Sequence, residues 1–193
     1  TLRNLVAESR GNAEEEFVNI ELNIGNSLIK GKIEKIYNER IISISFSKNE
    51  NKYLLEAYIK YLLAIAAQAP KELHFISAEK NKMYKISKHA VTRAQAFKTL
   101  QNLVNLYKEG HERILMFFPD LTRSPADAAG LNQEKFDVLL KKYFDGEFCD
   151  PYLMKERTFG FFKQEGIFEE YVQNCAAIFS DEGGLFSEYY LRK

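Results

Sequence analysis

The stretch IISISFSK at Ile41–Lys48, with GKIEKIY at Gly31–Tyr37 just before it, decides the fold of this chain. Apolar and polar side chains alternate along Ile41–Lys48, which is typical of a β-strand. One face of this strand carries Ile42, Ile44 and Phe46, and the other carries Ser43, Ser45 and Ser47. Three hydroxyl groups on one face of a strand that leads into a helix mark this strand as a candidate functional site.

The segments around this strand predict an α+β fold. Residues 16–47 predict a meander of three strands, with turns at Gly25–Asn26 and Asn38–Glu39. From about Asn51 the apolar residues recur at helical spacing, which predicts a helix that ends near Ala69. Two further strands then suit a hairpin around Lys80–Asn81.

The second half of the chain predicts helices separated by loops. An amphipathic helix follows the hairpin, and Gly110 is placed to cap its end. A loop from Asp120 to Gly130 precedes a helix that begins after Asn132, which is a favourable N-cap residue. A last helix is expected near residues 167–179.

These elements predict a single domain over residues 1–193, a mixed sheet with flanking helices. We expect its core at about residues 16–118 and a helical, loop-rich C-terminal part at about residues 119–193. Because the chain begins at Thr1 without a methionine, we expect it to be a fragment of a longer protein.

Composition favours a folded cytoplasmic domain without a strong electric field. The chain has 193 residues, of which 46% are hydrophobic, enough for one sizeable core. Its 27 lysines and arginines balance 27 aspartates and glutamates, so any contact with nucleic acid must be a local patch. Two cysteines cannot form a disulfide framework, which favours a reducing compartment. No stretch has the length of a membrane span or the pattern of a signal peptide.

Two motif halves resemble the active site of the PD-(D/E)xK nucleases, in which two acids hold Mg²⁺ and a lysine helps to activate water. Glu34 in GKIEKIY stands where these enzymes usually carry an aspartate. The acid-x-lysine of the next strand is replaced, because both registers place serines at the acid and lysine positions. Serine is a neutral hydroxyl and supplies neither charge. The resemblance therefore implies a degenerate site without catalytic residues and without a metal, at Glu34, Ser43, Ser45 and Ser47.

Two other interpretations of these motif halves stay open. Glu50 could act as a migrated acid, and Lys48 could reach the serine face if the strand ended or bulged there, which would give an active site with rearranged residues. Taken alone, GKIEKIY also fits an ordinary half-buried strand with Lys32 and Glu34 on its solvated side.

Longer stretches resemble the C-terminal part of the gamma chain of exodeoxyribonuclease V, the RecC-type subunit of the RecBCD helicase-nuclease. RIISISFSKNENKYLLEAYIKYLLAIAA at residues 40–67 resembles the strand, short connection and long helix of that family. LVNLYKEGHERILMFFPD at residues 103–120 resembles its Leu-x-x-x-Tyr-x-x-Gly motif and the apolar run that ends in Phe-Phe-Pro. DGEFCDPYLMKER at residues 145–157 resembles its Gly-Glu-x-x-Asp-Pro-Tyr segment.

This resemblance implies a nuclease-like fold that serves as a non-catalytic scaffold and DNA-handling domain. The complex would be an ATP-dependent helicase-nuclease of double-strand break repair and homologous recombination, in the bacterial cytoplasm. The implied partners are the beta (RecB-type) and alpha (RecD-type) subunits and DNA, single-stranded or at a duplex fork. This domain would hold no cofactor, since ATP and Mg²⁺ would be used by the partner subunits, and Chi recognition would lie outside this chain. The alternatives are an active Mg²⁺-dependent nuclease and an unrelated α+β protein-interaction domain.

Charged and aromatic side chains supply candidate contacts. Phosphate groups of DNA attract basic side chains, and the candidates are Lys30, Lys32, Lys35, Arg40 and Lys48. The same residues also fit a solvated charged face, because glutamates lie among them. Exposed aromatic residues often anchor interfaces, and Phe186, Tyr189 and Tyr190 are candidates for partner docking. We expect Cys149 to be a buried or half-exposed structural thiol, because the sequence places no base beside it. We assign no role to His74, His89 and His111, which lack metal-like spacing and are expected at the surface or as caps.

Overall fold

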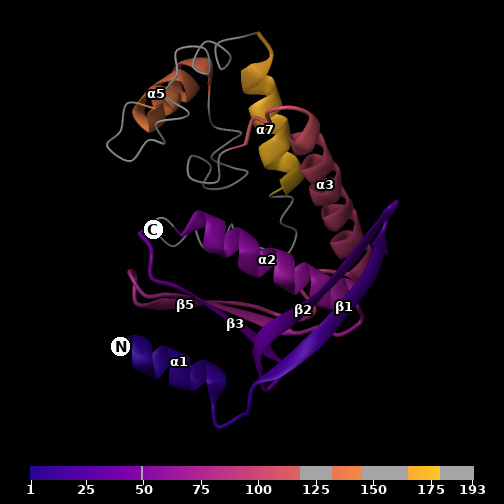
Figure 1. Cartoon of the computed structure of the whole chain (residues 1–193). Helices are drawn as coiled ribbons and strands as arrows, with labels where there is room; N and C mark the ends of the chain where they lie inside the picture. The colour runs from indigo at the N-terminus through magenta and orange to yellow at the C-terminus, as the bar shows by residue number, and fades with distance from the viewer. Residues whose placement is uncertain (49, 118–131, 145–164, 179–193) are drawn as a thin grey trace.

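A five-stranded mixed sheet lies at the centre of the computed structural model, which describes residues 1–48, 50–117, 132–144 and 165–178 (Figure 1). The strands lie in sequence order and are β1 (Glu16–Ile24), β2 (Ser27–Tyr37), β3 (Arg40–Ser45), β4 (Glu72–Ser77) and β5 (Lys82–Ile86). β1, β2 and β3 form an antiparallel meander, β4 runs parallel to β3, and β5 runs antiparallel to β4. The predicted α+β fold and the predicted meander and hairpin are confirmed.

Helices cover both faces of this sheet. The helices are α1 (Leu2–Arg10), α2 (Asn51–Ala66), α3 (Arg93–Glu112), α5 (Gln133–Phe144) and α7 (Ile167–Ile178). α1 and α2 lie on opposite faces of the sheet (Figure 1). Because of this, residues from Leu73 to Ser77 in β4 are all buried, whichever face their side chains occupy.

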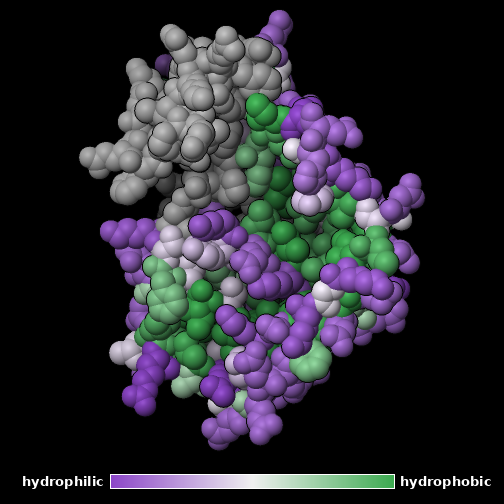
Figure 2. Space-filling view, in the orientation of Figure 1, coloured by the Kyte–Doolittle hydropathy of each residue, from purple (hydrophilic) through white to green (hydrophobic). Residues whose placement is uncertain are grey.

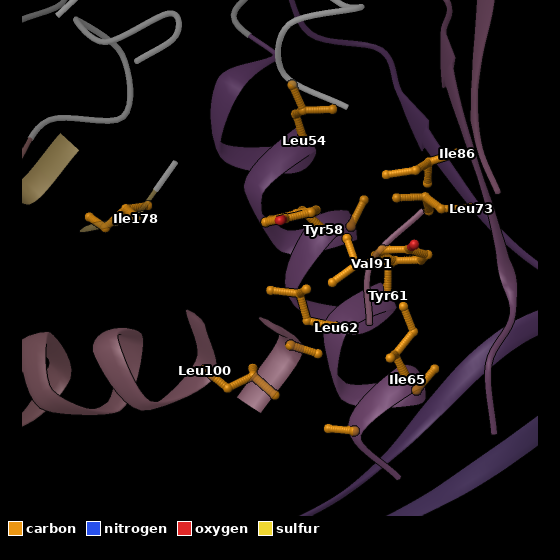
Figure 3. Packing of buried hydrophobic residues seen from close by; sticks show 14 of the residues in the cluster. Leu54, Tyr58, Tyr61, Leu62, Ile65, Leu73, Ile86, Val91, Leu100 and Ile178 are labelled. Atoms are coloured by element: carbon orange, nitrogen blue, oxygen red, sulfur yellow. The ribbon is translucent and has the colours of Figure 1, made fainter. Parts of the chain in front are cut away.

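The main core forms where α2 packs on the sheet (Figure 3). α2 buries residues at helical spacing, namely Leu54, Ala57, Tyr58, Tyr61, Leu62, Ala64, Ile65 and Ala66. The rings of Tyr58 and Tyr61 stack with their centroids 6.2 Å apart. Leu100 of α3 and Ile178 of α7 extend the same core away from the sheet.

The ends of α3 differ in how well the sequence predicts them. Thr92 and Gln95 form a capping box at its start, in which each side chain binds the backbone N–H of the other residue. The predicted cap at Gly110 is wrong, because the helix continues through Gly110 to Glu112. Arg113 follows the helix instead: its backbone N–H donates to the Glu109 carbonyl (2.9 Å), and its guanidinium pairs with Glu109. Arg113 also binds Glu170 of α7 at 2.7 Å, a tertiary contact that a local glycine signal does not contain.

Other helix predictions have mixed outcomes. The Asn132 side chain caps α5, since its Oδ1 accepts a hydrogen bond from the Lys135 backbone N–H at 2.9 Å. α7 also begins at the predicted residue. The sequence-based element order missed α1, although Leu2, Leu5, Val6 and Ser9 already follow helical spacing.

Part of the predicted C-terminal region lies outside the described residues, including Cys149, Phe186, Tyr189 and Tyr190. Within the part of the chain that the structure describes, no helix combines the length and the apolar character that crossing a membrane requires.

Candidate functional site: the serine end of strand β3

The predicted serine face lies where β3 and β4 end side by side. Ser45 pairs with Ser77 of β4 in the parallel register, and both residues are buried, with exposed fractions of 1% and 0%. The Ser45 Oγ accepts a hydrogen bond from the Ser47 backbone N–H (3.3 Å), and the Ser77 Oγ accepts one from the Lys80 N–H (3.0 Å). These hydroxyls therefore close the turns after their strands.

The predicted alternation of apolar and polar side chains does not continue beyond Ser45, where β3 ends. β3 ends at Ser45, so Ser47 lies beyond the strand, and Ser43 is half-buried inside it. Phe46, placed on the apolar face by the sequence pattern, is 74% exposed. Lys48 is exposed after the strand end.

An acid and a lysine meet beside these strand ends. Glu50 occupies the position just before α2 and is 2% exposed, and its Oε2 lies 2.9 Å from the Lys80 Nζ. Lys80 follows β4 in the turn to β5 and keeps 30% of its side chain exposed. Glu50 was weighed from the sequence as a migrated acid, whereas nothing in the local pattern indicated Lys80 as its partner.

Glu34 lies at a β-bulge of β2. Between the pairs Val18–Ile33 and Glu16–Ile36, β2 contains one residue more than β1, and Lys35 has a positive φ of 59°. Glu34 is exposed and pairs with Lys32 at 3.0 Å, as the ordinary-strand interpretation expects. Among the described residues, no three His, Cys, Asp or Glu side chains are arranged to hold a metal ion.

Glu15 ties this bulge to the start of β1. Its Oε1 accepts a hydrogen bond from the Lys35 backbone N–H (3.1 Å), and its Oε2 accepts one from the Tyr37 hydroxyl (2.7 Å). The Tyr37 hydrogen bond holds the pKa of Glu15 below its usual value and raises the pKa of Tyr37. The shape of the strand at Glu34 thus depends on a side chain from the connection that precedes β1.

Acidic neighbours accompany three of the five basic residues predicted to contact DNA. Lys30 pairs with Glu21 (3.0 Å), and Lys32, besides its pair with Glu34, lies 4.1 Å above the ring of Phe17. Arg40 lies 3.6 Å from Glu72. Lys35 sits on the bulge and is exposed. Their role in DNA binding stays a prediction.

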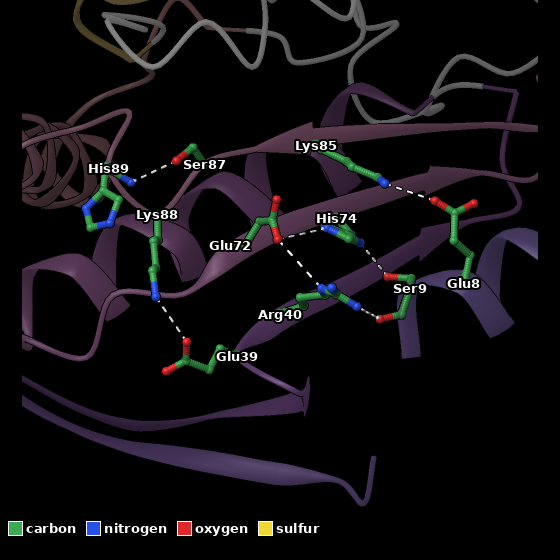
Figure 4. Close-up of polar contacts among 10 residues, drawn as sticks. All are labelled: Glu8, Ser9, Glu39, Arg40, Glu72, His74, Lys85, Ser87, Lys88 and His89. Atoms are coloured by element: carbon green, nitrogen blue, oxygen red, sulfur yellow. Dashed lines mark hydrogen bonds and ion pairs between the residues drawn. The ribbon is translucent and has the colours of Figure 1, made fainter. Parts of the chain in front are cut away.

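A buried polar cluster that no local sequence pattern indicates lies on the face of the sheet that α1 covers (Figure 4). The expectation that His74 lies at the surface or caps a helix is wrong, because it is 2% exposed within β4. Its Nδ1 lies 2.6 Å from the Ser9 Oγ, and burial lowers the pKa of its imidazole. His89 and His111 are exposed, as expected. A histidine inside the apolar run ELHFIS was the available signal.

A shallow groove lies between β2 and α2, with a volume of about 260 Å³. Its apolar lining comes from Ile20, Ile29, Ile33, Ile59 and Leu63. Gly31 opens the groove, since it stands between Ile29 and Ile33 and leaves space where a side chain would lie. Figure 2 shows apolar surface between hydrophilic residues on the face of the molecule that carries α2.

A comparison with protein families matches most of the chain. The family model of the RecC C-terminal domain matches residues 1–129, which contain the whole sheet and helices α1, α2 and α3. A comparison with curated proteins finds no match.

Proposed function

Because this chain belongs to the RecC C-terminal domain family, and so to the gamma subunit of RecBCD in DNA repair, we propose that it is a non-catalytic scaffold and DNA-handling domain. In this proposal the domain keeps a nuclease-like core that has lost its active site. Its partners are the RecB-type and RecD-type subunits and DNA at the fork. ATP and Mg²⁺ serve the partner subunits.

The order of elements supports the nuclease-like core. Strands β1 to β3 form a meander, and α2 follows β3 after a short connection, as in the nuclease arrangement that the motif halves resemble. Glu34 lies on β2, and Ser43 and Ser45 lie on the next strand, so the motif positions fall on the expected strands.

The single observation that carries the non-catalytic role is the state of Ser45. A metal ligand must present its oxygen to the ion, and the ion in turn contacts a phosphate group of the substrate. Ser45 is neutral, 1% exposed and hydrogen-bonded to the Ser47 backbone, so its oxygen serves the turn. Glu34, the remaining carboxylate of the motif, faces solvent and pairs with Lys32.

Cleavage of end-labelled single-stranded and double-stranded DNA by the folded chain, with Mg²⁺ or Mn²⁺, tests this proposal. We expect no cleavage above the level measured with EDTA, and no difference between the wild type and Glu34→Ala. Metal-dependent cleavage that Glu34→Ala abolishes would overturn the non-catalytic role.

The Glu50–Lys80 pair favours a second candidate, an active nuclease with rearranged residues. It supplies an acid and a lysine at the ends of β3 and β4, the two groups that the serine strand lacks. In that case Glu50→Gln abolishes metal-dependent cleavage, whereas Glu56→Gln, a change at an exposed glutamate of α2, does not. Absence of cleavage by the folded wild type rejects this candidate.

The DNA-handling part of the proposal has its own test. We expect weak binding to a forked duplex that falls as salt rises, because phosphate contacts release counterions. Replacing Lys35 and Lys48 together by Gln should weaken this binding, and replacing Lys98 and Lys108 of α3 should not. Equal affinities of both double variants and the wild type would remove these two lysines from the proposed DNA contacts.

A further inference from the structure

Helix α1 attaches to the sheet through a polar centre. It packs against β3, β4 and β5, and the residue it buries completely is a serine, Ser9, with 0% exposure. Leu2, Leu5 and Val6 are only half-buried. A helix of this length usually docks through an apolar stripe, so the stability of this contact depends strongly on the partners of Ser9.

Two sheet residues bind Ser9 directly (Figure 4). The Ser9 Oγ lies 2.6 Å from the His74 Nδ1, and the Arg40 guanidinium donates a hydrogen bond to the Ser9 carbonyl at 3.1 Å. On the other side of the imidazole, the His74 Nε2 lies 3.3 Å from the Glu72 Oε2. A neutral imidazole fits this arrangement when Nδ1 accepts a hydrogen bond from the serine hydroxyl and Nε2–H points toward Glu72.

Serine, histidine and glutamate in this order also occur in acyl-transfer sites. A catalytic role fails here on access, because the Ser9 hydroxyl is buried and no substrate carbonyl can approach it while α1 is docked. The cluster therefore acts on the helix that contains Ser9.

We propose that α1 is a releasable clamp on the sheet, and that protonation of His74 releases it. In the docked state the imidazole is buried, and its Nδ1 accepts a hydrogen bond from the Ser9 hydroxyl. A second proton on the ring removes that acceptor and places a cation beside the Arg40 guanidinium. Release of α1 returns the imidazolium to water and exposes the face of β3, β4 and β5 on which α1 packs.

The charges around His74 give the sign of the effect. Burial lowers the pKa of His74 most, and Lys85 of β5 and Arg40 of β3 lower it further, while Glu72 of β4 opposes them. On α1 itself, Glu8 pairs with Lys85 at 3.0 Å, and Arg10 lies over the Tyr37 ring. Lys85 holds the pKa of Glu8 below its usual value, so Glu8 stays ionised while His74 titrates.

The docked state therefore binds fewer protons than the released state. As pH falls below the ordinary histidine pKa of about 6.5, the ratio of released to docked α1 rises, by up to about 30-fold at pH 5. Above that pH the contribution of His74 to docking is fully present.

Amide hydrogen exchange of the whole chain between about pH 7.5 and about pH 5, corrected for intrinsic rates, tests the clamp. We expect the α1 amides to exchange through an opening of lower free energy than the β4 amides. The protection of the α1 amides should fall up to about 30-fold over this range. His89→Gln, which removes an exposed histidine, should behave as the wild type. His74→Gln should remove the dependence on pH.

Two results would overturn the clamp. One is that α1 and β4 amides exchange with equal protection, which means that α1 opens only when the whole domain unfolds. The other is the same pH dependence in His74→Gln and in the wild type. If His74→Gln leaves α1 unprotected at every pH, an NMR titration of the wild-type imidazole decides, because its midpoint must coincide with the loss of α1 protection.

Discussion

Buried hydroxyl groups in this protein have specific partners, and Tyr61 of α2 is an example. Tyr61 is 0% exposed and lies in the core between α2 and the sheet. Its hydroxyl donates a hydrogen bond to the Ser87 carbonyl at 2.8 Å, just after β5 ends. This hydrogen bond connects the core helix to the chain that leaves the sheet, and it satisfies a carbonyl outside the strand ladder.

Tyr61→Phe removes this donor and keeps the ring. We expect the free energy of unfolding to fall by about 1 kcal/mol, because the hydrogen bond from the Tyr61 hydroxyl is lost, although the Ser87 carbonyl keeps the one from the Ala90 N–H. Urea denaturation followed by circular dichroism measures this change. Tyr53→Phe, at a half-buried position of the same helix, is the matched control with an expected change near zero. Equal midpoints for both variants would contradict the importance of the Tyr61 hydrogen bond.

At the scale of elements, strand β2 combines a bulge with a gap in its apolar row. The bulge at Glu34–Lys35 lets both Ile33 and Ile36 point into the core, where they are 1% and 0% exposed. Gly31 breaks the same row, opposite Ile20 of β1, and opens the groove beneath α2. A glycine inside a strand also lowers stability through the greater freedom of the unfolded chain.

Gly31→Val should raise the free energy of unfolding by about 0.5 to 1 kcal/mol, because the new side chain fills the groove and favours an extended backbone. A Cβ atom at this position meets no atom within 4 Å. The matched control is Gly25→Val, which should destabilise, since Gly25 has a φ of 54° and its Cβ would lie 2.6 Å from the Gln101 Oε1. Thermal melts of both variants provide the measurement, and a lower melting temperature for Gly31→Val would contradict this account of the groove.

At the scale of the whole molecule, α7 is tied to the end of α3 through polar contacts. The Asn174 side chain donates a hydrogen bond to the Met116 carbonyl (3.1 Å), and the Glu170 carboxylate accepts one from the Met116 N–H (3.3 Å). Asn174 is 7% exposed, so its contact is largely shielded from water. Residues more than 50 positions apart in the chain are joined at this junction.

Asn174→Ala should lower the free energy of unfolding by about 1 to 3 kcal/mol, because the Met116 carbonyl is left buried without that partner. Gln173→Ala, on the exposed side of α7, is the control and should change little. Urea denaturation measures the change in the free energy of unfolding, and amide hydrogen exchange of the native protein shows whether α7 loses protection first. Unchanged protection of α7 in Asn174→Ala would contradict its role.

Local sequence patterns are enough to predict the order and type of most elements. Periodicity of two marked the strands of the meander, and periodicity of 3.6 marked α2 and α7, because burial of one side is recorded in the spacing of apolar residues. Residues 40–67 and 103–120 already pointed to the RecC family, whereas the interpretation of Glu34, Ser43 and Ser45 as positions of a degenerate motif stays a prediction.

Only the tertiary structure decided which distant residues meet. Ser9 and His74 are 65 positions apart, and Glu50 and Lys80 come from different connections, so no local spacing relates them. The end of α3 at Arg113 and the burial of Ser45 depend likewise on neighbours outside their own segments. Local patterns reflect which side of an element is buried, whereas partners across the sheet follow from how the elements pack, and this packing places the buried polar groups of the protein.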